Sequence, residues 1–213
     1  MLDYIYEISP VFDHLLKSIK KIALKMNIPI IKEDTLLYLI NLLYIHSPKK
    51  VLELGSGLGY STYTFSKYTP QDAKITSVDL SIETINRCKD VLAVSKYINK
   101  ISWVHSDALD YLKNNTLDYD LYFIDALKSD YPAYFNTILE KADENYIIIF
   151  DNLYMNGKVK EKNNPNDKRG EIIDNFNRKM FIKYSRNFVF LPIGDGLGIF
   201  TNFNRCEFIG IKD

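Results

Sequence analysis

Apolar and polar residues follow two periods along most of the chain, and the pattern predicts strands and helices in turn. Short apolar runs predict five strands, near residues 50–54, 74–79, 101–105, 119–124 and 145–150. Stretches with helical spacing predict helices near residues 59–68, 81–95, 107–114 and 131–142. Such regular alternation is typical of a parallel sheet with right-handed crossovers.

The N-terminal region, residues 1–46, shows helical spacing only. Its first helix is expected to have Ser9 as N-cap and Pro10 in the first turn, and to end at Asn27-Ile28-Pro29. A second helix is expected from about Asp34 to His46. We therefore expect one domain of 213 residues, in which residues 1–46 form a helical cap on an α/β core that spans residues 47–213.

The alternation also stops after Asp151. A polar, lysine-rich loop runs from Gly157 to Gly170, and a helix is expected at about 171–183. Two β-rich runs follow, at 187–191 and 197–202. Neighbouring strands joined by so short a link must be antiparallel. The sequence thus predicts a Rossmann-like, mostly parallel seven-stranded sheet that finishes in an antiparallel C-terminal hairpin.

Composition narrows the classes of function. The 27 basic and 27 acidic residues give a formal net charge of +0, so no overall field attracts nucleic acid or acidic lipid. No apolar run reaches the roughly 18–20 residues that span a bilayer, and the first residues lack the basic region of a signal peptide. Cys88 and Cys206 form no C-x-x-C pair and suit packing in a reducing compartment. We expect a cytoplasmic protein.

The strongest local signal is the glycine turn within Val51–Ser61, which reads E-x-G-x-G-x-G from Glu53 to Gly59. Glycine lets the backbone approach a ligand closely. The spacing differs from the G-x-G-x-x-G of dinucleotide folds. An acidic residue that enters the turn repels a diphosphate but suits a cation such as S-adenosylmethionine, which carries a sulfonium and an ammonium group. A protein that binds NAD at the same edge, or a non-catalytic Rossmann protein, stays open as the alternative.

Acidic residues end the next strands as well. Asp79 is placed to accept the ribose hydroxyls of an adenosine, the Asp107-Ala108 pair to face the adenine, and Asp125 to close the same edge. In open α/β sheets, ligands bind at the carboxyl edge of the strands. Each acid alone has the alternative role of a helix N-cap, but their order along the chain favours a cofactor site.

Asp151 and Asn152 end the fifth strand, next to Asp125 if the two strands are neighbours. Two carboxylates and an amide oxygen suit Mg²⁺, whereas His14, His46 and His105 are too scattered to form a zinc site. Lys128 follows Asp125 closely and is a candidate general base for a hydroxyl. The alternative is that Asp151 and Asn152 only open a turn and that Lys128 is a surface lysine.

Together these residues give the chain a resemblance to the cation-dependent class I O-methyltransferases, the family of the catechol and caffeoyl-CoA O-methyltransferases. The resemblance covers nearly all of the chain. It rests on Val51–Ser61, Val78-Asp79, Ser106-Asp107-Ala108 and Phe123–Lys128, and on the more family-specific Asp151–Gly157 and Leu191–Leu197.

The resemblance implies an S-adenosylmethionine methyltransferase fold, a Mg²⁺ ion (or Mn²⁺ or Ca²⁺) and a homodimer. It implies that Lys128 is the base and that Asp125, Asp151 and Asn152 bind the metal. The residues implied to hold the cofactor are Glu53, Gly55, Ser56, Ser61, Asp79, Asp107, Ala108 and Asp125.

The acceptor stays open. The chain departs from many family members at Lys32-Glu33-Asp34-Thr35 and at Tyr154, both of which border the acceptor site in the family. The acceptors considered are a small catechol-like phenol, an acyl-CoA ester that bears a catechol, and 5-hydroxyuridine at the tRNA wobble position, since all three carry a hydroxyl beside a second oxygen. The lysines of loop 157–170 would contact phosphate in the RNA case; an ordinary solvated loop is the alternative.

Overall fold

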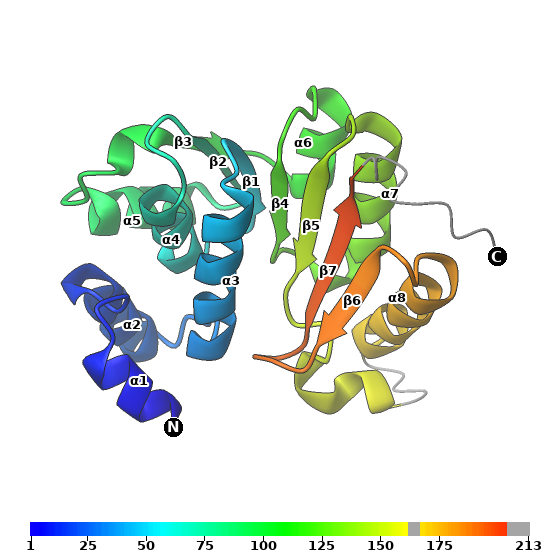
Figure 1. The fold of residues 1–213 in the computed structure, drawn as a ribbon, viewed down its shortest axis with the longest axis horizontal. Helices are drawn as coiled ribbons and strands as arrows, with labels where there is room; N and C mark the ends of the chain where they lie inside the picture. The colour runs from blue at the N-terminus through cyan, green and yellow to red at the C-terminus, as the bar shows by residue number, and fades with distance from the viewer. Residues whose placement is uncertain (162–166, 204–213) are drawn as a thin grey trace.

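The computed structural model describes residues 1–161 and 167–203. Its centre is a seven-stranded sheet in the order β3-β2-β1-β4-β5-β7-β6 (Figure 1). The strands are β1 (Lys50–Leu54), β2 (Lys74–Asp79), β3 (Ile101–His105), β4 (Leu121–Ile124), β5 (Tyr146–Phe150), β6 (Phe188–Leu191) and β7 (Leu197–Asn202). The first five strands pair in parallel, and β7 pairs antiparallel with both β5 and β6. The predicted fold class is confirmed, hairpin included.

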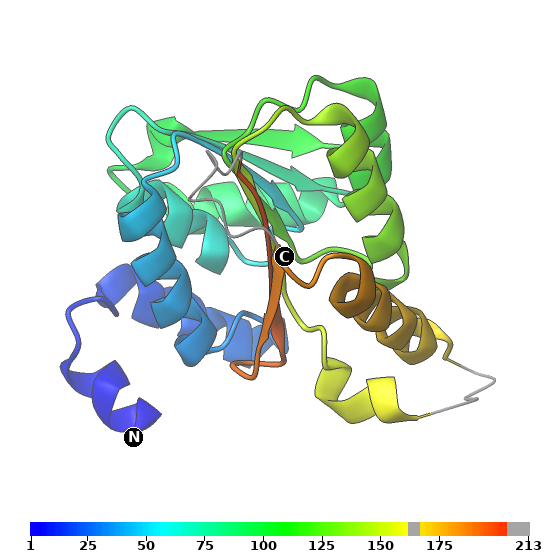
Figure 2. The ribbon, with the colours of Figure 1, turned by 45° about the vertical axis from the view of Figure 1, so that its right-hand side comes forward.

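Helices cover both faces of the sheet, which Figure 2 shows nearly edge-on. The side chains of β1 alternate between the two layers: Val51 packs with the cap helices, and Leu52 and Leu54 pack on the opposite face. The helices are α1 (Leu2–Ile8), α2 (His14–Met26), α3 (Glu33–His46), α4 (Tyr60–Tyr68), α5 (Ile82–Leu92), α6 (Ala108–Asn114), α7 (Tyr131–Lys141) and α8 (Arg169–Lys183), with short 3₁₀ turns η1 (Ile98–Lys100), η2 (Lys128–Asp130) and η3 (Met155–Lys160).

The start of the cap differs from the prediction. One helix capped by Ser9 was expected, but the chain forms α1, breaks after Ile8 and begins α2 at His14. Asp13 is the N-cap, because its carboxylate accepts the Leu16 N–H at 2.9 Å. The same carboxylate accepts a hydrogen bond from the Lys67 ammonium at 2.7 Å, so it also connects the N-terminal helical region to α4.

The hairpin between β6 and β7 is tied to the start of α3. The Gly194 N–H donates to Asp34 Oδ2 at 2.8 Å, and Lys32 Nζ donates to the Gly194 carbonyl at 3.1 Å. A Cβ on Gly194 would lie 2.1 Å from Thr35 Oγ1, so this position needs glycine. These contacts bring the cap and the hairpin together at the carboxyl edge of the sheet. The edge is thereby bordered by segments from both ends of the chain.

Candidate functional site

A buried carboxylate, Glu53, lies behind the carboxyl edge. Its side chain is 0% exposed and accepts hydrogen bonds from the hydroxyls of Ser61, Thr62 and Ser77, each at 2.5 Å. Burial raises the pKa of Glu53 to about 7, and the nearby charge of Asp125 raises it further, against the lowering effect of the three hydroxyls.

This geometry adds a structural role to the one predicted for Glu53. Through the three hydroxyls, its carboxylate holds the start of α4 against β1 and β2; the predicted contact with a cofactor stays a prediction. The strand register places Ser77 directly beside Glu53. A small polar residue inside the apolar β2 run was the signal in the sequence that could have revealed this partner.

The glycine turn delivers two site residues at once. Gly55 has φ +94°, and a Cβ there would lie 2.3 Å from the Asp125 carbonyl oxygen, so the turn packs directly on the end of β4. The next residue, Ser56, donates from its backbone N–H at 2.9 Å and its hydroxyl at 2.8 Å to Asp79 Oδ2. The turn therefore fixes the Asp79 carboxylate.

A cavity of about 310 Å³ opens between these strand ends. A volume of this size suits a small organic cofactor. Five of the predicted cofactor residues line it, together with Leu127 and Tyr134, which sequence reasoning did not identify: Gly55, Asp79, Asp107, Ala108 and Asp125. A small adjoining cavity is lined by Ser56, Ser61 and again by Gly55 and Asp125.

Asp107 is a helix N-cap and at the same time lies where a cofactor contact was predicted, so one residue can have both roles. Its Oδ1 accepts from the N–H groups of Leu109 and Asp110 and so caps α6, as the N-cap alternative proposed. The same residue lines the 310 Å³ cavity with Ala108. The cap therefore fixes the carboxylate at the cavity wall.

The structure brings the predicted metal ligands Asp125 and Asp151 together. Strands β4 and β5 end side by side, with Ile124 opposite Phe150, and the Asp151 N–H donates to the Ile124 carbonyl at 3.1 Å. Asp151 is 2% exposed. Burial, and secondly the neighbouring charge of Asp125, raises the pKa of Asp151 to about 7.

Asn152 follows directly in the left-handed conformation, with φ +62°. Two adjacent acids plus an amide form a site that fits a hard cation, since a positive charge would offset both the burial and the repulsion. Within residues 1–161 and 167–203, no group of three or more His, Cys, Asp or Glu side chains could hold a metal ion. Binding here therefore depends on Asn152 and on water to complete the ligand set.

Lys128, the candidate base, points into the same edge. Its ammonium donates to Asp125 Oδ1 at 2.6 Å and to the Tyr131 hydroxyl at 2.6 Å. The Tyr131 hydroxyl in turn lies 3.0 Å from the Ile124 carbonyl and 2.9 Å from the Asp151 carbonyl. Lys128 is thus a half-buried, paired lysine rather than a solvated one. Tyr131 is a site residue that sequence reasoning missed.

A strained loop follows the acids. Asn152, Met155 and Asn156 all have positive φ, which costs free energy for residues other than glycine. Asp195 of the hairpin holds this loop: its Oδ1 accepts the Asn156 N–H at 2.7 Å and its carbonyl accepts the Tyr154 N–H at 2.9 Å. The hairpin motif therefore fixes the backbone beside Asn152. The sequence marked this motif only through the resemblance.

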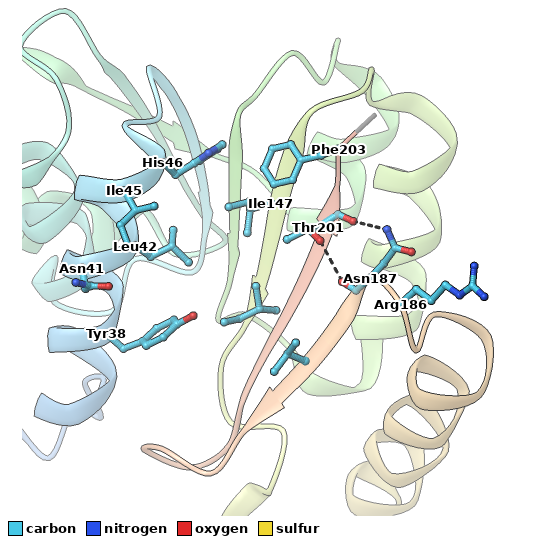
Figure 3. Close-up of a pocket in the computed structure, with 12 residues that line it drawn as sticks. Tyr38, Asn41, Leu42, Ile45, His46, Ile147, Arg186, Asn187, Thr201 and Phe203 are labelled. Carbon is cyan, nitrogen blue, oxygen red and sulfur yellow. Dashed lines mark hydrogen bonds between the residues drawn. The ribbon is translucent and has the colours of Figure 1, made fainter. Parts of the chain in front are cut away.

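A larger groove, of about 480 Å³, lies elsewhere, between α3 and the strands β5, β7 and β6 (Figure 3). It lies on one face of the sheet near the start of β5, whereas the predicted site residues lie at the end of that strand. Apolar side chains such as Leu42, Ile147 and Val189 line it, and none of its lining residues in the described part of the chain is an acid. The groove therefore does not resemble the site predicted for cation chemistry.

The remaining predicted side chains have structural roles. His46 and His105 contact the backbone carbonyls of Asp120 and Leu80. Cys88 is buried and free, as expected of a packing residue, and Cys206 lies outside the described residues. No helix in the described part of the chain is long and apolar enough to cross a membrane.

Comparison with known proteins identifies the family of the chain. The O-methyltransferase family model matches residues 6–202. The tapetum-specific methyltransferase 1 of Arabidopsis thaliana is 30% identical over 181 residues, which cover 81% of this chain and 76% of that protein. The caffeoyl-CoA O-methyltransferase of Stellaria longipes is 30% identical over 160 residues, which cover 70% of this chain and 66% of that protein.

Solved structures share the fold. An O-methyltransferase from Bacillus cereus in complex with S-adenosylhomocysteine superposes with a TM-score of 0.80 at 20% identity, covering 94% of this chain and 96% of that one. TomG from Streptomyces achromogenes, in complex with S-adenosylmethionine, also gives 0.80, at 19% identity, covering 94% of each chain. Because the family model spans almost the whole described chain, this protein belongs to the O-methyltransferase family.

Proposed function

We propose that this protein transfers the methyl group of S-adenosylmethionine to a hydroxyl that has a second oxygen beside it, with the help of a divalent cation. The observation that carries the proposal is that Asp125 lines the 310 Å³ cavity and also has Asp151 and Lys128 as neighbours. Asp125 belongs to both halves of this site. A donor and an acceptor bound there would meet at that residue.

The donor half suits S-adenosylmethionine. Asp79, fixed by the Ser56 amide and hydroxyl, is placed to accept ribose hydroxyls, and Ala108 offers an apolar wall to the adenine. The acidic lining disfavours a phosphate and favours a sulfonium. These features, together with the family match, set aside the NAD-binding alternative.

Asp125, Asp151 and Asn152 would hold the cation. A Mg²⁺ ion bound there would supply positive charge that lowers the pKa of the acceptor hydroxyl. The chain's own residues do the rest. Lys128 takes the hydroxyl proton; the oxygen then attacks the methyl carbon, and the carbon–sulfur bond breaks to leave a thioether. The rigid turn and the hairpin keep the two substrates aligned.

The described contacts support a small acceptor more than RNA. Lys158 is paired with Asp167 at 3.2 Å, and the Lys160 ammonium lies 5.5 Å from the centre of the Tyr154 ring. Both lysines thus have partners inside the protein, and Lys162 lies outside the described residues. We therefore propose a phenol or an acyl-CoA ester with a catechol group as the acceptor, with tRNA 5-hydroxyuridine as the rival that the test must exclude.

The test combines calorimetry with a methyl-transfer assay on caffeate, caffeoyl-CoA and tRNA that carries 5-hydroxyuridine. We expect S-adenosylhomocysteine to bind, and EDTA to abolish methylation of a catechol until Mg²⁺ is restored. Asp151→Ala should abolish transfer and leave S-adenosylhomocysteine affinity nearly unchanged, because Asp79 and the glycine turn lie apart from Asp151. Asp118→Ala, which removes an exposed partner of Lys50, is the matched control and should change neither quantity.

Full activity in EDTA would exclude the metal, and methylation of the tRNA alone would exclude the small acceptor. The homodimer implied by the family resemblance is a separate proposal. Light scattering on the purified protein tests it, and a monomeric mass at assay concentration would exclude it.

A further inference from the structure

The Tyr131 hydroxyl occupies a central position at the edge where β4 and β5 end. Tyr131 is the first residue of α7 and is 0% exposed. Its oxygen has three neighbours within hydrogen-bond distance: Lys128 Nζ at 2.6 Å, the Asp151 carbonyl at 2.9 Å and the Ile124 carbonyl at 3.0 Å. One phenol therefore contacts the candidate base and both strand ends that carry the candidate metal ligands.

The number of protons makes these contacts directional. A phenol has one proton to donate, and the two carbonyls can only accept, so its proton points to a carbonyl. The oxygen lone pairs then face Lys128, which donates to them.

Lys128 has a second partner in Asp125, at 2.6 Å. If Asp125 binds a cation, its carboxylate is shared between the cation and Lys128, and its contact with the lysine weakens. The position of the Lys128 side chain then depends on its contact with the Tyr131 hydroxyl. Ring packing places the phenol independently of the lysine, since the Tyr131 ring lies 5.6 Å from that of Phe150 and 6.3 Å from that of Tyr134.

We propose that Tyr131 is a positioning residue for methyl transfer: its hydroxyl holds the Lys128 amine at the acceptor hydroxyl and keeps it from settling fully on Asp125. The inference rests on the proposed function, because it gives Lys128 and Asp125 the roles assigned there. Tyr131 is fully buried and does not line the 310 Å³ cavity, so its effect would pass through Lys128.

Tyr131→Phe tests the proposal, because it keeps the buried ring and removes only the hydroxyl. We expect kcat to fall by about tenfold to about 100-fold, the loss that follows from a misplaced catalytic group, with little change in the KM for S-adenosylmethionine. In addition, Mn²⁺ affinity, measured by electron paramagnetic resonance, should weaken by up to about tenfold. The reason is that the released ammonium competes with the cation for Asp125.

Tyr122→Phe is the matched control. Tyr122 is also 0% exposed, and its hydroxyl donates to the Leu117 carbonyl at 2.9 Å, outside the site. Both variants lose one buried hydroxyl that faces a backbone carbonyl, so thermal unfolding should show similar losses of stability. A role that is merely structural predicts similar kinetics for the two variants, whereas positioning predicts that only Tyr131→Phe lowers kcat.

A double-mutant cycle with Lys128→Ala completes the design. If Tyr131 acts through Lys128, adding Tyr131→Phe to Lys128→Ala should change neither kcat nor Mn²⁺ affinity further. Additive losses would overturn the proposal, as would a Tyr131→Phe variant with the kcat of the wild type. Failure of the proposed function is distinguishable, since the wild-type protein would then be insensitive to EDTA or inactive on every catechol, before any variant is compared.

Discussion

Glu53→Gln is expected to make the ligand-free protein more stable at neutral to alkaline pH. In the folded protein the pKa of Glu53 is raised from 4.5 to about 7. An acid whose pKa is raised on folding contributes stability that is fully present below its unfolded pKa and is lost as the pH rises through its folded pKa. The wild-type protein therefore loses stability from this group between about pH 4.5 and about pH 7.

The magnitude follows from the shift. At about 1.4 kcal/mol for each pKa unit, the whole contribution is about 3 kcal/mol, and about 2 kcal/mol of it is lost between about pH 5 and about pH 7.5. A glutamine imitates the neutral acid and stays neutral throughout. Its two amide protons can serve Thr62 and Ser77, whose hydroxyls accept as well as donate, while Ser61 donates to the remaining oxygen.

Urea unfolding of both proteins at a series of pH values is the assay. The two free energies of unfolding should agree near pH 4.5 and diverge in favour of Glu53→Gln by about 3 kcal/mol near pH 7.5. Calorimetry should show a weaker S-adenosylmethionine affinity relative to S-adenosylhomocysteine, because only the former carries the sulfonium charge. Parallel stability profiles for the two proteins would refute the reasoning that Glu53 is a buried acid with a raised pKa.

Two further substitutions test the packing of the site. Gly55→Ala places a Cβ 2.3 Å from the Asp125 carbonyl oxygen and should destabilise the protein by more than about 2 kcal/mol. In Gly57→Ala the new Cβ lies 3.8 Å from its nearest neighbour, so the loss of stability should be about 1 kcal/mol, from φ strain alone. Equal shifts of the melting temperature in the two variants would contradict this. The hydroxyl of buried Tyr60 has no hydrogen-bond partner among residues 1–161 and 167–203, so Tyr60→Phe should be neutral or stabilising in urea unfolding. A loss above about 1 kcal/mol would reveal a partner.

The strand ends were predictable from sequence because their information is local. A polar residue that stops an apolar run marks the end of a buried strand, and Asp79, Asp125 and Asp151 all lie there. Parallel pairing then brings them to one edge without further assumptions. The meeting of Asp125 and Asp151 required in addition that β4 and β5 be neighbours, which the sequence left as a condition and the structure shows.

What could not be predicted depends on contacts distant in sequence. The hydrogen bonds of Glu53 to Ser77, a strand away, and to the first turn of α4 could not be predicted from the sequence. Tyr131 was missed because an aromatic residue at the start of a helix usually serves packing, and only the three-dimensional structure places its oxygen beside two carbonyls and Lys128. Asp13, and not Ser9, is the N-cap of α2, and its ion pair with Lys67 is a further contact distant in sequence.

The charges at the carboxyl edge connect the stability of the fold to its ligands. Glu53 and Asp151 are buried acids with raised pKa values, and Asp125 adds negative charge to both. Lys128 offsets part of this charge through its contact with Asp125. Ionising these acids costs free energy when no ligand is bound at the edge. A positively charged ligand lowers that cost, because one positive charge stabilises several carboxylates at once. A sulfonium donor and a divalent cation are both such ligands, so we expect the affinity for each to increase as the pH rises and these acids ionise.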